Sequence, residues 1–285
     1  MALVAGFLIS ASCSPTCGPA ITLGVTRALL KDMELFSEYS SAIYCDNNAV
    51  SPKGTPITCR AADGYNSCPS VEGIEAFVYG NFFNVGYYSG TGVLAVDPHN
   101  KQLVLVFRGA EYLGATTKAL PNLIPCHAVC KACKCHEGFY TAWTEVRPQA
   151  ISLVKSARIA YPNYRLIITG HSLGATQSGY AAAEFRANGT KATLYNYGGP
   201  HIGDINFAEF VTSQGDNYRV THTTDPAPRI GDPNSGYRHI SPEYWIYEDR
   251  NQNFTVSTDQ IQVIQGFNSI FGNEVSTILT DPKSA

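Results

Sequence analysis

Apolar and polar positions along the chain alternate between two spacings, one typical of helices and one typical of strands. Apolar side chains recur every three or four residues over 22–44, which predicts a helix. The run Leu103-Val104-Leu105-Val106-Phe107 is apolar throughout, as expected of a strand covered on both faces. By the same criteria, strands are predicted at 75–80, 92–96, 102–107, 165–169, 192–197, 218–221, 244–248 and 261–264, and helices at 139–160, 173–187 and 204–214.

This order of elements predicts an α/β fold with a mostly parallel central sheet flanked by helices. Irregular segments are expected at 45–71, 109–138 and 225–243. The length of 285 residues suits a single domain, and the chain shows no internal repeat or linker. We therefore expect one folded domain over 21–285.

The first twenty residues contain a short apolar run and no charged side chain. We interpret 1–20 as a signal peptide, and a buried N-terminal segment is the alternative. The chain has 9 cysteines, which favours an oxidising compartment, and the sequons Asn188-Gly189-Thr190 and Asn253-Phe254-Thr255 agree with it. No stretch is long enough for a transmembrane helix. The sequence thus predicts a secreted, extracellular protein.

Charge and composition exclude several classes of partner. The net charge is −3 and only 15% of residues are charged, so no basic face for nucleic acid is indicated. Gly90 and Gly92 alone make no phosphate-binding fingerprint. A zinc site could be built from the cluster Cys126, Cys130, Cys133, Cys135 and His136, but an oxidising compartment favours disulfides there. We expect no metal and no cofactor.

The segment Gly170-His171-Ser172-Leu173-Gly174 lies between an apolar strand and a helix of small residues. A Gly-X-Ser-X-Gly sequence in that setting predicts a nucleophile elbow, a sharp turn that lifts the serine hydroxyl above the sheet. The two glycines avoid collisions between strand and helix, and the helix N-terminus favours a developing oxyanion. The alternative is an ordinary helix-capping serine. Ser172 is therefore the candidate nucleophile.

The chain resembles the fungal class 3 lipases, a family that also contains feruloyl esterases. Matching segments include the elbow itself and the following: Phe107-Arg108-Gly109, Cys135-His136-Glu137-Gly138-Phe139, Tyr197 to Gly203, Tyr218 to Arg229, Ala42-Ile43-Tyr44-Cys45 and Ser241-Pro242-Glu243-Tyr244-Trp245. The resemblance implies a single-domain α/β-hydrolase that cleaves carboxylic esters, acylglycerols first among them, through a serine acyl-enzyme. It implies an apolar ester substrate, dissolved or at a lipid interface, and a monomer. A catalytically impaired lipase-like protein that binds lipid, or a feruloyl-type esterase, are the alternatives.

A serine nucleophile needs a base, and the base needs a carboxylate that orients it. Asp225 follows a predicted strand in a proline-rich loop, which suits that carboxylate. The resemblance of Thr221-His222-Thr223-Thr224-Asp225 to the family's acid segment implies the same role. The alternatives are Asp204, as a helix cap, and Asp232, as a turn residue.

The oxyanion hole is expected to use the backbone N–H of Leu173, directly after the nucleophile. By resemblance, the second N–H comes from Ala110, where many members of the family carry a serine or threonine hydroxyl as well. Residues 111–120 occupy the position of the family's lid but form only a weakly amphipathic pattern. A plain surface loop is the alternative for this segment.

The chain has 7 histidines, and none stands where the family has its base, which is near the C-terminus. Aligned by eye, Ala285 falls at or beside the residue before that histidine. The hypothesis is that the domain is truncated at its C-terminus relative to a functional enzyme. An impaired but complete chain, or His239 as a replacement base, are the alternatives, whereas His136 is interpreted as structural.

The number of cysteines and their expected pairing agree with the hypothesis of a truncated C-terminus. Short-loop disulfides are expected for Cys59 with Cys68 and for Cys130 with Cys133, and Cys126 with Cys135 form a further candidate pair. With Cys13 and Cys17 assigned to the expected signal peptide, this leaves Cys45, whose counterpart in the family pairs with a cysteine of the extreme C-terminal tail.

Overall fold

The computed structural model describes residues 21–60, 64–110, 122–248, 255–267 and 272–275. The expected signal peptide at 1–20, the segment 111–120 and the sequon at Asn253 lie outside the described residues. Within the described part of the chain, no helix is both long enough and apolar enough to cross a membrane.

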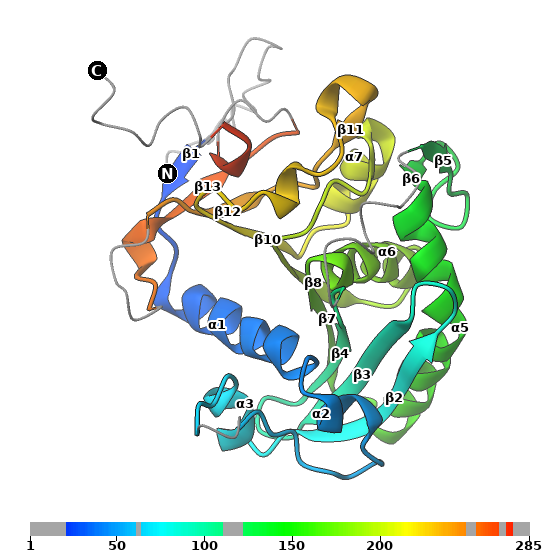
Figure 1. The fold of residues 1–285 in the computed structure, drawn as a ribbon, viewed down its shortest axis with the longest axis vertical. Helices are drawn as coiled ribbons and strands as arrows, with labels where there is room; N and C mark the ends of the chain where they lie inside the picture. The colour runs from blue at the N-terminus through cyan, green and yellow to red at the C-terminus, as the bar shows by residue number, and fades with distance from the viewer. Residues whose placement is uncertain (1–20, 61–63, 111–121, 249–254, 268–271, 276–285) are drawn as a thin grey trace, which may run out of the picture.

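A nine-stranded sheet runs through the described structure (Figure 1), in the order β1-β13-β12-β10-β8-β7-β4-β3-β2. Its strands are β1 (Ile21–Leu23), β2 (Phe77–Val85), β3 (Gly90–Asp97), β4 (Gln102–Phe107), β7 (Arg165–His171), β8 (Ala192–Tyr197), β10 (Asn217–His222), β12 (Glu243–Ile246) and β13 (Ile261–Ile264). A small sheet is formed by β11 (Tyr237–Arg238), β9 (Gly203–Asp204), β6 (Lys134–His136) and β5 (Leu123–Pro125). The α-helices are α1 (Arg27–Ala42), α2 (Asp46–Val50), α3 (Pro69–Gly73), α5 (Glu137–Ala160), α6 (Leu173–Ala187) and α7 (Ile205–Ser213). Short 3₁₀ turns are η1 (Ala227–Arg229), η2 (Pro233–Ser235), η3 (Thr258–Gln260) and η4 (Gly272–Val275).

The centre of the large sheet is parallel and its two edges are antiparallel. Strands β12, β10, β8, β7 and β4 pair in parallel, whereas β3 and β2 on one side and β13 and β1 on the other pair antiparallel. The α/β-hydrolase fold predicted from the sequence is therefore confirmed. Because the central strands are parallel, their carboxyl ends lie along one edge of the sheet, where α/β proteins place their sites.

Helices cover both faces of the sheet, as Figure 1 shows for α1 on one side and α5 with α6 on the other. Strand β4 divides its side chains between these layers. Leu103, Leu105 and Phe107 pack in the core cluster of α5 and α6, whereas Val104 and Val106 pack in the cluster of α1. All of them are 0% exposed, as expected from the continuous apolar run. The two apolar cores hold the central strands rigidly in place.

The N-terminal element differs from its prediction. Residues 21–23 form strand β1, which pairs antiparallel with β13, although they fall within or beside the helix predicted over 22–44. Helix α1 begins only at Arg27 because Thr26 caps it, its Oγ1 accepting a hydrogen bond from the Leu29 amide at 3.1 Å. The pairing partner of β1 lies far away in the sequence, so no local pattern indicates this strand.

The three expected disulfides are present: Cys59–Cys68, Cys126–Cys135 and Cys130–Cys133. The cysteine cluster at 126–135 is thus joined in disulfide bonds and offers no thiolates to a metal. Cys45 is a free, partly buried cysteine. The segment 45–71, predicted to be irregular, in fact contains α2 and the start of α3.

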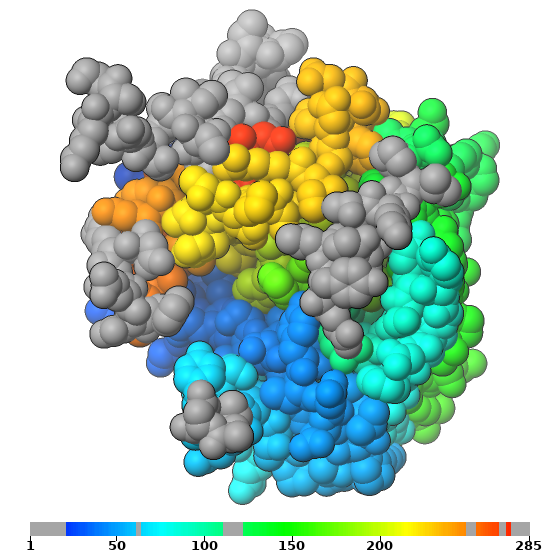
Figure 2. Space-filling model, in the orientation of Figure 1, coloured from blue at the N-terminus to red at the C-terminus, as the bar shows by residue number. Residues whose placement is uncertain are grey.

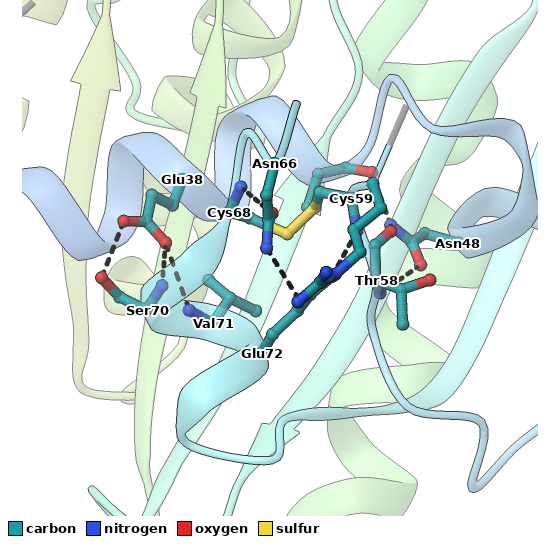
Figure 3. Close-up of a disulfide and its surroundings, with 11 residues drawn as sticks. Glu38, Asn48, Thr58, Cys59, Asn66, Cys68, Ser70, Val71 and Glu72 are labelled. Carbon is teal, nitrogen blue, oxygen red and sulfur yellow. Dashed lines mark hydrogen bonds and ion pairs between the residues drawn. A yellow bond between two sulfur atoms is a disulfide. The ribbon is translucent and has the colours of Figure 1, made fainter. Parts of the chain in front are cut away.

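Two carboxylates hold the Cys59–Cys68 loop in place through hydrogen bonds (Figure 3). Glu72 accepts hydrogen bonds from the Cys59 amide at 2.9 Å and from Asn66 Nδ2 at 2.7 Å. Glu38 of α1 accepts from the Ser70 amide at 2.7 Å, at the N-terminus of α3. A carboxylate is favourable at a helix N-terminus because the first amides have no partner within the helix.

His136 serves helix α5, in agreement with its structural interpretation from the sequence. It is the N-cap, and its ring Nδ1 accepts a hydrogen bond from the Phe139 amide at 3.3 Å. Its ring also stacks on Phe139, with 3.9 Å between ring centroids. Burial lowers the pKa of His136 from 6.5 to about 4, so the ring is neutral near neutral pH.

This burial makes a prediction about pH. The unfolded chain takes up a proton at His136 below about pH 6.5 and the folded chain only below about pH 4, so stability falls as the pH drops through that window. The variant His136→Asn keeps a capping oxygen but cannot be protonated. Between about pH 6.5 and pH 4, the free energy of unfolding of the wild type should therefore fall by about 3 kcal/mol more than that of His136→Asn. Urea unfolding at the two pH values measures this, and equal losses would contradict it.

Candidate active site

Ser172 joins strand β7 to helix α6 through a strained turn. Its backbone has φ 56° and ψ −122°, a conformation that a residue with a side chain rarely adopts. The Ser172 amide donates to the Tyr197 carbonyl at 3.0 Å, and the Ser172 carbonyl accepts from the Ala175 amide at 3.0 Å. The turn is thereby tied to strand β8 and to the first turn of α6, which is the local geometry that a nucleophile elbow requires.

Two glycines let the chain approach itself at this turn. A Cβ on Gly170 would overlap the backbone of Gly174, and a Cβ on Gly174 would overlap the Phe107 carbonyl. Both obstacles are main-chain atoms that cannot rotate away. The spacing of the glycines about Ser172 is therefore a steric requirement for packing α6 across β7 and β4.

The loop that follows β4 lies against the elbow. Gly109 packs on the His171 carbonyl, where an added Cβ would come within 2.8 Å of that oxygen. Ala110 comes next and is half-buried, and Leu173, the first residue of α6, is 7% exposed. The structure thus brings the segments of the two expected oxyanion donors together beside Ser172.

Tyr44 connects this loop to the elbow. Its hydroxyl accepts a hydrogen bond from the Gly109 amide and contacts His171 Nδ1 at 3.0 Å. Because the Gly109 amide can only donate, the hydroxyl proton is available to His171 Nδ1. Tyr44 belongs to the segment Ala42-Ile43-Tyr44-Cys45 that resembles the family, but no sequence pattern predicts a role for it.

Asp225 lies just beyond the end of β10, in a turn that fixes its carboxylate. The Asp225 amide donates to the His222 carbonyl at 2.9 Å, and Oδ1 accepts from the Ala227 amide at 2.9 Å. The other oxygen, Oδ2, faces Gly198, where an added Cβ would stand 3.0 Å from it and 3.6 Å from His171 Nε2. The Asp225 carboxylate and the elbow therefore approach one another across the end of β8.

The charge of Asp225 acts on His171. It raises the pKa of the His171 ring, but the loss of surrounding water is the larger effect and lowers that pKa. Since Nδ1 of His171 contacts Tyr44, its Nε2 is the nitrogen on the side of Asp225.

In Figure 2, surface from the middle of the chain, in green, is visible between the blue N-terminal helices and the yellow segment after β10.

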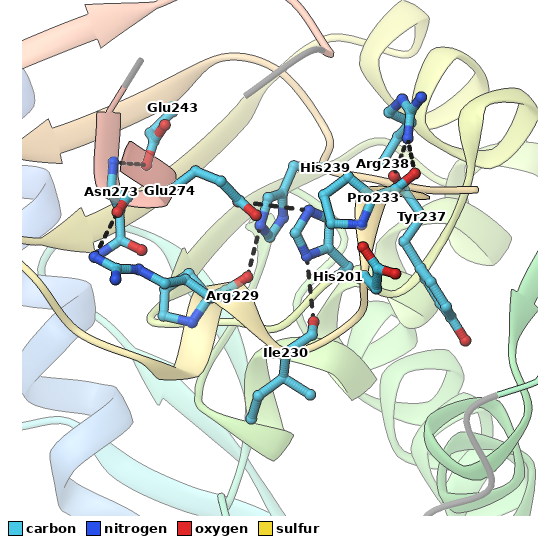
Figure 4. A network of polar contacts seen from close by, with 12 residues as sticks. His201, Arg229, Ile230, Pro233, Tyr237, Arg238, His239, Glu243, Asn273 and Glu274 are labelled. Atoms are coloured by element: carbon cyan, nitrogen blue, oxygen red, sulfur yellow. Dashed lines mark hydrogen bonds and ion pairs between the residues drawn. The ribbon is translucent and has the colours of Figure 1, made fainter. Parts of the chain in front are cut away.

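His239, the candidate replacement base, lies in a buried polar cluster (Figure 4). It is 5% exposed, its Nε2 contacts the Pro228 carbonyl at 2.9 Å, and its ring stacks on His201 with 3.6 Å between centroids. Burial lowers its pKa well below the ordinary value for histidine. With one nitrogen bound to a carbonyl and one face against another ring, His239 has the environment of a structural residue.

The carboxylates weighed against Asp225 have the local roles that the sequence suggested. Asp204 caps α7, its Oδ1 accepting from the Phe207 amide at 3.0 Å. Asp232 closes the turn at η2, accepting from the Asn234 amide at 2.8 Å. Neither carboxylate is held at the end of a central strand, as that of Asp225 is.

A strained serine turn after β7 and a carboxylate after β10, at the carboxyl ends of parallel strands that β8 separates, are typical of an α/β-hydrolase. A family model described as Lipase (class 3) matches residues 104–234. The secreted mono- and diacylglycerol lipase A of Penicillium cyclopium is 35% identical over 250 residues, which cover 87% of this chain and 80% of that protein. The secreted mono- and diacylglycerol lipase 1 of Fusarium solani is 37% identical over 254 residues, covering 87% and 73%.

Solved structures agree with this. The mono- and diacylglycerol lipase of Aspergillus oryzae superposes with a TM-score of 0.79 at 35% identity, covering 87% of this chain and 90% of that one. A mutant lipase of Penicillium cyclopium gives a TM-score of 0.80 at 36% identity, covering 88% and 91%. The chain belongs to the class 3 lipase family. It is a secreted carboxylic ester hydrolase, so the hydrolase prediction is confirmed and the alternative of a lipid-binding protein without activity is not favoured.

The elbow packing generates a prediction with a matched control. Alanine is a better helix former than glycine by about 1 kcal/mol, so Gly174→Ala should stabilise α6 if helix propensity decided the outcome. Its Cβ would instead meet the Phe107 carbonyl, so we expect a net loss of about 2 kcal/mol or more. The control is Gly73→Ala in α3, whose Cβ would meet nothing within 4 Å. Urea unfolding compares the two, and equal stabilities would contradict the steric account.

Proposed function

We propose that Ser172 is the nucleophile of ester hydrolysis and that Asp225 is the acid that orients the base. The backbone amides of Ala110 and Leu173 form the oxyanion hole. The observation that carries the proposal is the strained turn at Ser172, which lies against the loop of Ala110 and approaches Asp225 across Gly198.

The chemistry follows from this arrangement. As the base takes the hydroxyl proton, Ser172 Oγ attacks the ester carbonyl, and the two amides stabilise the negative charge that develops on the carbonyl oxygen. The base then returns its proton to the leaving alcohol, and an acyl-serine remains. Water attacks this ester by the same steps, which releases the carboxylic acid and restores the serine.

The proposal gives the role of base to neither His239 nor His171. His239 is held by the Pro228 carbonyl and by its stack on His201. His171 directly precedes the nucleophile in the chain, and its Nδ1 contacts Tyr44. Asp225 nevertheless has the geometry of an orienting acid, because Ala227 holds Oδ1 while Oδ2 faces the elbow.

For the substrate we propose acylglycerols with one or two acyl chains. The relatives that are 35% and 37% identical are named mono- and diacylglycerol lipases. Exposed aromatic side chains support an apolar substrate. Phe83 is 41% exposed and lies beside Arg108 of the oxyanion loop, and Tyr44, which is 38% exposed, contacts that same loop.

Three variants test the assigned residues on a monoacylglycerol substrate. Ser172→Ala should abolish turnover, and Asp225→Asn should lower kcat by about 10⁴-fold, as in other triads. The matched control is Asp232→Asn, which changes an exposed turn carboxylate and should leave kcat unchanged. Wild-type turnover by Ser172→Ala, or equal losses for both aspartate variants, would contradict the proposal.

The substrate class is tested separately, by comparing mono-, di- and triacylglycerols that carry the same acyl chain. We expect kcat/KM to be higher for the mono- and diacylglycerols than for the triacylglycerol. A triacylglycerol cleaved as fast as the others would overturn the substrate assignment while leaving the ester hydrolase chemistry intact.

A further inference from the structure

The side chain of Asn273, in turn η4, reaches into the loop that carries the acid. It is 1% exposed, and its Nδ2 donates to the backbone carbonyls of Asp225 at 3.0 Å, Thr223 at 3.1 Å and His222 at 3.3 Å. An amide group has only two hydrogens, so three acceptors share them. One buried side chain thus donates hydrogen bonds to three backbone carbonyls of a single turn.

The main chain of Asn273 is held from two other elements (Figure 4). Its carbonyl accepts from Arg229 Nη2 at 2.7 Å, and its amide lies 3.4 Å from Glu243 Oε1. The same Glu243 oxygen accepts from Thr221 Oγ1 of β10 at 2.6 Å. Asn273 is therefore fixed relative to β10, the strand that precedes Asp225.

The turn that Asn273 contacts is one that requires support. Thr223 has φ 34°, in the left-handed region that favours glycine. Carbonyl oxygens that converge repel one another unless donors lie between them, and a buried carbonyl that loses its donor costs about 1–3 kcal/mol. Trp245 Nε1 also donates to the Thr223 carbonyl, at 3.0 Å, whereas the donor to the Asp225 carbonyl is Asn273 Nδ2.

We propose that Asn273 is a positioning residue for Asp225. It acts through the backbone of 222–225 and so sets the direction in which Asp225 Oδ2 faces Gly198 and the elbow. This inference rests on the proposed function, because it takes Asp225 to be the acid. A carboxylate that is misplaced by about 1 Å costs on the order of 100-fold in rate, whereas substrate binding elsewhere is unaffected.

Asn273→Ala should therefore lower kcat by about 10- to 100-fold on a monoacylglycerol while KM changes less than about 3-fold. Asn273→Ser keeps one hydroxyl donor and should recover part of that loss. The control is Asn163→Ala, in the exposed turn before β7, which should leave both constants unchanged. A wild-type kcat for Asn273→Ala, or a loss confined to KM, would overturn the inference.

Hydrogen–deuterium exchange gives a readout that needs no turnover. Asn273→Ala should speed exchange at the amides of Asp225 and Ala227, which bond within this turn, but not in β7. Asn273→Ser serves the same comparison if the alanine variant does not fold. Unchanged exchange in the turn overturns the positioning role by itself. If exchange rises as expected while Ser172→Ala or Asp225→Asn leaves hydrolysis intact, the proposed function fails and the hold of Asn273 on the turn stands.

Discussion

The close approach of α6 to the end of β4 is the constraint on which the rest of the site depends. It is possible only because Gly174 has no side chain to meet the Phe107 carbonyl. The approach forces the chain to reverse at Ser172 with a positive φ, which costs on the order of 1–3 kcal/mol. The strain is offset by burial on both sides of the turn, since β7 lies in the middle of the sheet and nearly every side chain of α6 is buried.

The acid side depends on contacts between parts of the chain that are distant in sequence. Asp225 follows β10 and the elbow follows β7, and β8 separates these strands. Gly198, at the end of β8, leaves the space in which the carboxylate and the elbow approach each other. Turn η4 closes this side through Asn273, so the loop of Asp225 is held by a segment from near the end of the described chain.

Features encoded by neighbouring residues could be predicted from the sequence. The strand–turn–helix around Ser172, the strand of 102–107 covered on both faces, and the disulfides between cysteines close in sequence all follow from local spacing. Strand β1 could not be predicted, because its hydrogen-bonding partner β13 lies some 240 residues later in the chain. No local pattern of residues indicates which distant strands become neighbours in the sheet.

The supporting residues of the site were missed for the same reason. Tyr44 and Asn273 act through hydrogen bonds to segments far away in the sequence, and a lone tyrosine or asparagine carries no spacing signal. From the sequence, His239 remained an alternative for the base, because the sequence does not show that its ring stacks on His201. Burial of that pair, rather than distance along the chain, decides its role.

We propose that the fold itself makes Ser172 reactive. Treatment of the folded protein with an organophosphonate ester, followed by peptide mapping, tests it directly. We expect one phosphonyl group per chain, located on Ser172, and none when the protein is first unfolded in urea. A folded protein that takes up no phosphonyl group, or takes it up equally at other serines, would contradict the account.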